Sequence, residues 1–308
     1  MNRPTPPRPV RQEPDPHWEH YELYQRVREA LHAVPSYFTS DIRISGIRAT
    51  DIFNLNAILG AAIEERVVDT LNTMRPVWDP DGKYELYSFV RQAQTFPDVL
   101  LRHSANLDDI LFGIELKGWY LLAKEGEPSF RFVASPNVCA PADLFVVYPW
   151  YLSEVISGVP RLLPPFLDNA KYVAELRNYH WQYEMHRRGI NSGEIRLSTI
   201  DKPYPSKNAA ISDEPVSDKG NNFGRIARSG IMDDFTAKND ARLLSGIPAG
   251  MWRRFLLLFK DATTEASIEQ AFGRLKREIR NSANVDDDQL DEALSKARAI
   301  LNVLLDAS

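Results

Sequence analysis

Cysteine is nearly absent from this chain, since Cys139 is the only one among 308 residues. A single cysteine cannot form an internal disulfide or build a cysteine-rich metal cluster. We therefore expect a protein of a reducing, cytoplasmic environment, in which Cys139 is a small and buried apolar side chain. The fold then depends on burial of apolar residues, which make up 44% of the chain and suffice for a substantial core.

Long apolar runs are absent as well. A membrane span needs about 18 or more consecutive apolar residues, and no stretch of the sequence approaches that length. The N-terminus is proline-rich and polar, unlike a secretory signal peptide. We therefore expect no membrane span and no export.

Positive charge is in deficit. Lys and Arg number 37 against 42 Asp and Glu, which gives a net charge of −5 at pH 7. This balance argues mildly against a nucleic-acid partner, because binding to phosphates needs local positive potential. It does not exclude one, since an acidic chain can carry a basic cleft and this chain concentrates Arg and Lys in particular segments.

The spacing of apolar residues indicates a mixed α/β fold. Helices are predicted over 18–33, 51–74 and 166–188. Strands are predicted over 83–90, 99–101, 110–114 and 144–148. From residue 231 onward the pattern is again helical, with helices predicted over 251–261, 264–279 and 288–305. We therefore expect a mixed central sheet flanked by helices, with a largely helical C-terminal extension.

Charged side chains follow one of the predicted strands directly. Glu115 and Lys117 are two positions apart after the apolar run 110–114, so on an extended strand they project from the same face. Charges at the end of a buried strand are costly unless they have partners. Asp98 precedes another apolar run, and the chain between it and Glu115 is long enough for a strand, a polar loop and a return strand. We therefore expect Asp98 to lie beside Glu115.

Two carboxylates at adjacent strand ends form a hard-oxygen site of the kind that suits Mg²⁺. We predict that Asp98 and Glu115 bind Mg²⁺, for which Mn²⁺ can substitute. A bound ion lowers the pKa of a coordinated water and neutralises charge that develops on a phosphate. Lys117 is expected to position or deprotonate the attacking water and to stabilise the transition state. Asp109 is a fallback acidic ligand if the assignment of Asp98 fails.

The pattern Pro97-Asp98 followed by Glu115-Leu116-Lys117 resembles the PD-(D/E)xK nuclease superfamily, which includes most type II restriction endonucleases. The resemblance covers roughly residues 50–150 and implies a restriction-endonuclease-like core. It also implies the function, a Mg²⁺-dependent, sequence-specific endonuclease that hydrolyses phosphodiester bonds in double-stranded DNA. In this superfamily a helix before the sheet often contributes a further acidic residue, and Glu64 fits that place better than Glu65 because it lies on the helix's apolar side.

One departure from the superfamily's pattern concerns the connection after the Glu-x-Lys strand. The superfamily usually has a clear helix there. Pro136 and Pro141 leave room in this chain for only a short helix, because proline breaks the interior of a helix. The path of the chain over residues 122–143 is therefore open.

The domain organisation is expected to comprise a flexible proline-rich arm over 1–16, a nuclease core over 17–189, and DNA-recognition loops with a helical C-terminal region over 190–308. Basic and amide side chains in this last region suit contacts with phosphates and base edges. The predicted DNA contacts are Lys202, Lys207, Lys219, Asn221, Asn222, Arg225 and Arg228. A solvated connector explains the composition of 190–230 equally well.

Two alternatives to the restriction-type reading stay open. The first is a structure-specific repair or junction nuclease of the same superfamily, although the long region beyond the core favours sequence recognition. The second is a non-catalytic DNA-binding or protein-interaction module whose acidic cluster is structural. The apolar side of the predicted helix 288–305 could pack within the chain or form a homodimer contact.

Overall fold

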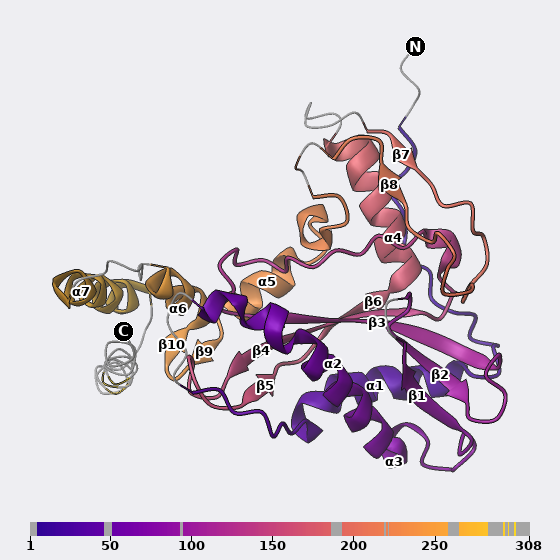
Figure 1. Ribbon diagram of the computed structural model, residues 1–308, viewed down its shortest axis with the longest axis horizontal. Helices are drawn as coiled ribbons and strands as arrows, with labels where there is room; N and C mark the ends of the chain where they lie inside the picture. The colour runs from indigo at the N-terminus through magenta and orange to yellow at the C-terminus, as the bar shows by residue number, and fades with distance from the viewer. Residues whose placement is uncertain are drawn as a thin grey trace.

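A computed structural model of the chain describes residues 5–45, 51–92, 95–185, 193–218, 220, 222–257 and 265–282, together with positions 292, 295 and 299. Figure 1 shows one central mixed sheet with helices packed against it and further helices towards the C-terminus. This arrangement agrees with the mixed α/β fold predicted from the sequence. None of the described helices is long and apolar enough to cross a membrane.

The central sheet has six strands in the order β1-β2-β3-β4-β5, and β6 also pairs with β4. The strands are β1 (Tyr87–Arg91), β2 (Val99–His103), β3 (Ile110–Tyr120), β4 (Leu144–Leu152), β5 (Pro160–Leu162) and β6 (Phe166–Asn169). β3 and β4 run parallel, whereas the other neighbours pair antiparallel. β3 is longer than predicted, because the residues after Ile114 pair with β4.

The connection from β3 to β4 contains no α-helix among its residues 121–143, all of which the structure describes. It has one short 3₁₀ helix, η2 (Pro136–Val138). Three prolines in this stretch lack the N–H that a continuing helix needs. The departure from the superfamily's usual helix, expected from the sequence, is therefore present. Cys139 follows η2 and is buried, as predicted.

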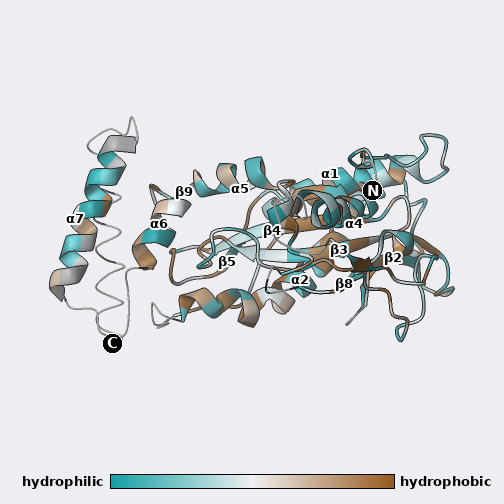
Figure 2. Cartoon of the chain, turned by 90° about the horizontal axis from the view of Figure 1, so that it is seen from above, coloured by the Kyte–Doolittle hydropathy of each residue, from teal (hydrophilic) through white to brown (hydrophobic). Residues whose placement is uncertain are grey.

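Two long helices, α1 (Tyr21–Tyr37) and α2 (Leu55–Thr73), pack against each other and against the central sheet, where Figure 2 shows much of the apolar, brown part of the chain. The Tyr148 hydroxyl in β4 donates to the Leu31 carbonyl of α1 at 2.6 Å. The helix α2 lies along β1 and β3 and brings Glu64 close to the predicted site. Two short helices, η1 (Ile52–Asn54) and α3 (Arg75–Trp78), flank α2.

The buried residues of both long helices recur every three or four positions, as expected for helices with one apolar face. They include Leu23, Val27, Leu31 and Val34 in α1, and Leu59, Ile63, Val67 and Leu71 in α2. This pattern is why the sequence predicted both helices, although α1 extends four residues beyond the predicted end at Ala33 and α2 begins at Leu55 rather than at residue 51.

Two boundaries predicted from the sequence were wrong. The helix predicted to begin at Phe166 begins at Ala170, because Phe166–Asn169 pairs with β4 as β6. A short apolar run fits a strand as well as a helix, so periodicity could not distinguish them. The strand predicted from Lys83 begins only at Tyr87, after a turn. The helix α4 (Ala170–Tyr179) continues into a π-helix, η3 (His180–Met185).

The region after residue 193 combines short strands with helices. Its elements are β7 (Ile195–Arg196), β8 (Glu214–Pro215), η4 (Ile226–Ser229), α5 (Asp233–Asp240), β9 (Leu243–Leu244), β10 (Ile247–Pro248), α6 (Ala249–Leu256) and α7 (Glu265–Ser282). The β9–β10 hairpin interrupts the helical pattern that was predicted from residue 231 onward. The predicted helix 288–305, with its homodimer contact, lies outside the described residues apart from three isolated positions.

The described part of the N-terminal arm, residues 5–16, is attached to the body of the protein. Arg11 donates to both carboxyl oxygens of Asp168 at 2.6 Å, and the side chain of Asp168 is 3% exposed. The Arg11 guanidinium also lies over the Tyr172 ring, 4.9 Å from its centroid. This bidentate pair connects the described part of the arm to β6 and α4, and the flexibility expected of the arm stays a prediction.

Candidate active site

The β2–β3 hairpin brings three predicted site residues together. Val99 pairs with Ile114, so Asp98, one residue earlier, lies opposite Glu115, where the sequence predicted it. Lys117 projects from the same face of β3 as Glu115. Its Nζ atom lies 2.7 Å from Glu115 Oε1 and 3.0 Å from Asp98 Oδ2. One ammonium therefore bridges two carboxylates at this edge of the hairpin.

Asp98 is held in place through its backbone and its side chain. The Leu116 N–H donates to Asp98 Oδ2 at 2.9 Å, and the Gln92 N–H donates to the Asp98 carbonyl at 2.6 Å. The Gln92 side chain also donates to the Pro97 carbonyl at 3.1 Å. These bonds fix the carboxylate relative to β3, which is the positional precision that a catalytic group needs.

Glu64 reaches the cluster from α2. It accepts a hydrogen bond from the Gly118 backbone, and its Oε2 atom lies 3.8 Å from the Arg91 guanidinium at the end of β1. Its side chain is 23% exposed, whereas that of Glu65 is 68% exposed and points to solvent. Of the two adjacent glutamates in α2, Glu64 is therefore the one beside Lys117, as the sequence predicted.

Burial and mutual repulsion dominate the electrostatics of this cluster. Burial, together with the neighbouring Asp98 carboxylate, raises the pKa of both Glu64 and Glu115 to about 7. Burial opposes the charge on Lys117, but the Glu115 and Asp98 carboxylates outweigh it and raise the pKa of this lysine. The cluster therefore combines a firmly protonated ammonium with two carboxyl groups that titrate near neutral pH.

The donor set suits a divalent cation, although the ammonium of Lys117 now lies between the carboxylates. Glu115 Oε2 is buried and has no hydrogen-bond partner among the described residues. A buried carboxylate oxygen without a donor is destabilising, and a cation beside it would remove that penalty. Within the described part of the chain, no group of three or more His, Cys, Asp or Glu side chains is arranged to hold a metal ion. The fit with Mg²⁺ thus rests on carboxylate chemistry and on the partnerless Glu115 oxygen.

Asp109 lies at the other end of β3, one residue before its first residue, Ile110. Its carboxylate accepts a hydrogen bond from the Tyr87 hydroxyl at 2.8 Å. This position is a whole strand length from Lys117, so Asp109 does not belong to the cluster.

The predicted DNA-contacting residues fall into two groups. Lys202 and Lys207 are exposed, and neither forms an ion pair with any residue that the structure describes. Arg225 and Arg228 instead pair with acidic residues of the β3–β4 connection. Arg225 lies 3.0 Å from Glu125, and Arg228 lies 3.3 Å from Glu127. These arginines can contact DNA only if they exchange their present partners for phosphates.

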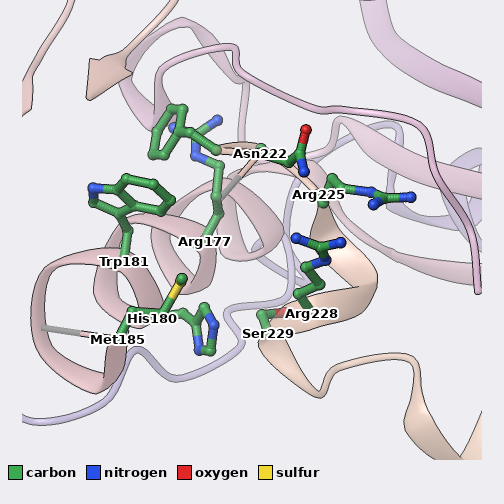
Figure 3. A pocket seen from close by; sticks show the side chains of 10 residues that line it. Arg177, His180, Trp181, Met185, Asn222, Arg225, Arg228 and Ser229 are labelled. Atoms are coloured by element: carbon green, nitrogen blue, oxygen red, sulfur yellow. The ribbon is translucent and has the colours of Figure 1, made fainter. Parts of the chain in front are cut away.

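Asn222 lines a pocket together with Arg225 and Arg228, as Figure 3 shows. Its side-chain oxygen accepts a hydrogen bond from Arg131 at 2.6 Å, which holds it away from a free base-reading position. The remaining two predicted contacts, Lys219 and Asn221, lie outside the described residues.

Sequence reasoning missed the residues that hold Asp98 and Glu64. Gln92 and Arg91 follow one another at the end of β1, and no motif marks them. Their contribution depends on the pairing of β1 with β2, in which Arg91 lies opposite Val99. The one usable signal was their proximity in the sequence to Pro97-Asp98. In a hairpin of β1 and β2, the residues that end β1 lie beside the residues that precede β2.

No known protein family, curated protein or solved structure matches this chain. The case for the site therefore comes from the geometry of Asp98, Glu115, Lys117 and Glu64.

Proposed function

We propose that this protein is a Mg²⁺-dependent nuclease that hydrolyses phosphodiester bonds in double-stranded DNA. The observation that carries the proposal is the convergence of Asp98, Glu115 and Lys117. The Lys117 Nζ atom lies within 3.0 Å of a carboxylate oxygen of each of the two acidic residues. A short motif arises by chance in many sequences, and in this chain its separate parts also lie together in space. Glu64 joins them from the preceding helix, as the resemblance to the PD-(D/E)xK superfamily implies.

Asp98 and Glu115 are the residues that would hold the metal ion, because their carboxylates adjoin and one Glu115 oxygen has no partner among the described residues. When bound, Mg²⁺ would lower the pKa of a coordinated water and place a positive charge beside the phosphate. The hydrogen bonds from Leu116 and Gln92 keep Asp98 aligned for this role.

Lys117 acts as a hydrogen-bond donor in this proposal. Its pKa is raised by the two carboxylates, so the ammonium stays protonated at neutral pH and cannot take a proton from water. It can orient the attacking water and stabilise the negative charge that develops on the phosphate oxygens. Of the two roles expected from the sequence, positioning therefore fits better than deprotonation.

Glu64 is the better candidate for accepting the proton. Burial raises its pKa to about 7, which places it near the pH at which a general base is most effective. Its hydrogen bond from Gly118 holds the carboxyl group over β3. Arg91, 3.8 Å from Glu64, adds a cation at the edge of the site that can face a DNA phosphate.

Sequence-specific cleavage of the type II kind is the finer part of the proposal. The region after residue 190 carries the exposed Lys202 and Lys207, which can hold the DNA backbone. A structure-specific nuclease would need less chain beyond the catalytic core. Discrete fragments from a plasmid of known sequence would support sequence-specific cleavage, whereas cleavage only at branched DNA would support the repair-type alternative.

The direct test is cleavage of plasmid DNA by the purified protein. We expect cleavage with Mg²⁺ or Mn²⁺ and none with EDTA. Lys117→Ala should lower the cleavage rate by about 100-fold or more, because it removes the charge that stabilises the transition state, while DNA binding stays measurable. Lys83→Ala is the matched control, since Lys83 precedes β1 at the opposite end of the hairpin from Asp98. Full activity of Lys117→Ala would refute the assignment.

A non-catalytic binding module is the second candidate, because Lys117 already neutralises parts of both carboxylates as a structural ion pair would. This candidate predicts that the protein binds DNA equally with and without divalent ions. It also predicts that the wild-type protein leaves plasmid DNA intact under all metal conditions.

A further inference from the structure

Asp143 is a fully buried carboxylate directly before β4, and the proposed reaction does not use it. It accepts hydrogen bonds from the Gly113 N–H at 2.6 Å, the Ala140 N–H at 2.7 Å and the Tyr204 hydroxyl at 2.5 Å. Three donors around one buried carboxylate form a rigid connection, because each bond is strong in a low-dielectric interior. Asp143 therefore joins β3, β4 and the segment that contains Tyr204.

Gly113 connects Asp143 to the catalytic edge. A Cβ atom at this position would lie 2.2 Å from Pro97 Cγ and 3.1 Å from Asp143 Oδ1. The absence of a side chain lets the Pro97 ring lie directly on β3 beside the Asp143 carboxylate. Pro97 immediately precedes Asp98 in the chain. The contact of Pro97, Gly113 and Asp143 therefore fixes the position of the backbone from which the Asp98 side chain projects.

Tyr204 connects the same contact to the segment 198–213. Its backbone has a φ of 50°, in the left-handed region that non-glycine residues rarely adopt. Such strain persists only where the surrounding contacts favour it, and the bond to Asp143 is such a contact. Lys202 and Lys207, the exposed lysines proposed to hold DNA, flank Tyr204 in this segment.

The two ends of the segment are also fixed. Asp213 pairs with the buried Arg177 of α4 at 2.7 Å and accepts the Ser198 N–H at 3.0 Å. The hydrogen bond between Ser198 and Asp213 thus joins the two ends of the segment, and Tyr204 connects its middle to Asp143 at the start of β4. Tyr204 lies between the two lysines in the sequence, so it links them to the catalytic edge through Asp143.

We propose that Tyr204 and Asp143 are positioning residues that couple the DNA-holding segment 198–213 to Asp98, so that bound DNA tightens the alignment of Asp98. This inference rests on the proposed nuclease function. Neither side chain touches the reacting atoms. They act through the Gly113 backbone and the Pro97 ring, and the expected consequence is an effect on the rate of cleavage rather than on the affinity for DNA.

Tyr204→Phe tests the coupling because it removes only the hydroxyl. We expect the single-turnover cleavage rate at saturating DNA to fall by about tenfold or more, since small displacements of catalytic groups slow reactions strongly. DNA affinity, measured with Ca²⁺ in place of Mg²⁺, should change by less than about twofold, because the backbone contacts of the lysines remain.

Tyr148→Phe is the matched control. The Tyr148 hydroxyl also makes a short buried hydrogen bond, at 2.6 Å, but to α1 on the other side of the sheet. Its loss should lower stability to a similar degree and leave the cleavage rate close to that of the wild type. Equal rates for Tyr204→Phe and Tyr148→Phe would overturn the coupling, and so would a loss of DNA affinity that accounts for the whole loss of rate.

Amide hydrogen exchange separates a failure of the coupling from a failure of the nuclease proposal. DNA should slow exchange of the amides of residues 95–100 in the wild type and in Tyr148→Phe, but not in Tyr204→Phe. This readout needs no cleavage. If the wild type cleaves no DNA, the proposed function fails, whereas the same exchange pattern still supports the coupling. Identical exchange in all three proteins would overturn it.

Discussion

At the scale of single residues, the candidate site is defined by an imbalance of charge. Glu64, Asp98 and Glu115 surround one ammonium, that of Lys117, and both glutamates have a pKa raised to about 7. Sequence reasoning found these residues because their order and spacing follow a pattern with a physical basis. It could not find Gln92, Asp143 or Tyr204, whose partners are set by the register of the sheet and by the path of a loop.

Glu64 gives a prediction on pH dependence. Its pKa is about 7 in the folded protein against 4.5 in the reference state, mainly because of burial. A folded-state pKa raised in this way contributes stability that is full below the unfolded pKa and is lost as pH rises through the folded pKa. Without divalent ions, the free energy of unfolding should therefore fall between about pH 4.5 and about pH 7.

Glu64→Gln should flatten this pH dependence in urea denaturation, because glutamine does not ionise. Glu65→Gln is the control, since Glu65 adjoins Glu64 in the sequence and is largely exposed. A pH dependence that is the same in wild type and Glu64→Gln would contradict the account. Glu115 has the same direction of shift, so part of the slope should remain in Glu64→Gln.

At the scale of elements, the β2–β3 hairpin matters most, and the sequence predicted it from two apolar runs around a polar loop. The length of the intervening chain allowed Asp98 to lie beside Glu115, and the pairing of Val99 with Ile114 places it there. The extension of β3 to Tyr120 was not predicted, because it depends on parallel pairing with β4, a strand distant in the sequence. The boundary of β6 was missed for a similar reason, since its strand form depends on β4 rather than on local periodicity.

Gly113 gives a prediction at this scale. Gly113→Ala should lower the free energy of unfolding by about 2 kcal/mol, because a methyl group must displace Pro97 from β3. The same displacement of Pro97 shifts the backbone of Asp98, the next residue, so the cleavage rate should fall together with the free energy of unfolding. Thermal unfolding and plasmid cleavage measure the two effects.

The control for Gly113→Ala is Gly273→Ala in α7, where an added Cβ meets no atom within 4 Å. Alanine favours a helix, so this variant should be more stable than the wild type by about 0.5–1 kcal/mol. Its cleavage rate should be unchanged. A Gly113→Ala protein as stable and as active as the wild type would show that Pro97 does not need the space above Gly113.

At the scale of the whole molecule, segments far apart in the sequence meet around the central sheet. The arm reaches β6 through Arg11 and Asp168, and the segment 198–213 reaches the start of β4 through Tyr204. The sequence predicted a flexible arm and a separate recognition region, and this division of the chain stays a prediction. The contacts of Arg11 and Tyr204 with the body that carries the candidate site could not be predicted, because composition does not reveal long-range contacts (Figure 1).

The net charge of −5 illustrates the same limit of composition. It argues against a nucleic-acid partner only as an average over the surface. The structure places acidic residues in the candidate site and leaves Lys202 and Lys207 exposed on a segment attached beside it. The net charge averages over such local arrangements, so the sequence alone could not show them.

The measurement that tests the central claim most directly is Mn²⁺ binding to the intact chain by titration calorimetry. The account predicts that the wild type binds Mn²⁺ and that Asp98→Asn weakens the affinity by about tenfold or more, because a charged ligand is lost. Asp109→Asn, at the far end of β3, should bind like the wild type. A wild-type protein that binds no Mn²⁺, or an Asp98→Asn variant with unchanged affinity, would contradict the claim that this cluster is a metal-dependent active site.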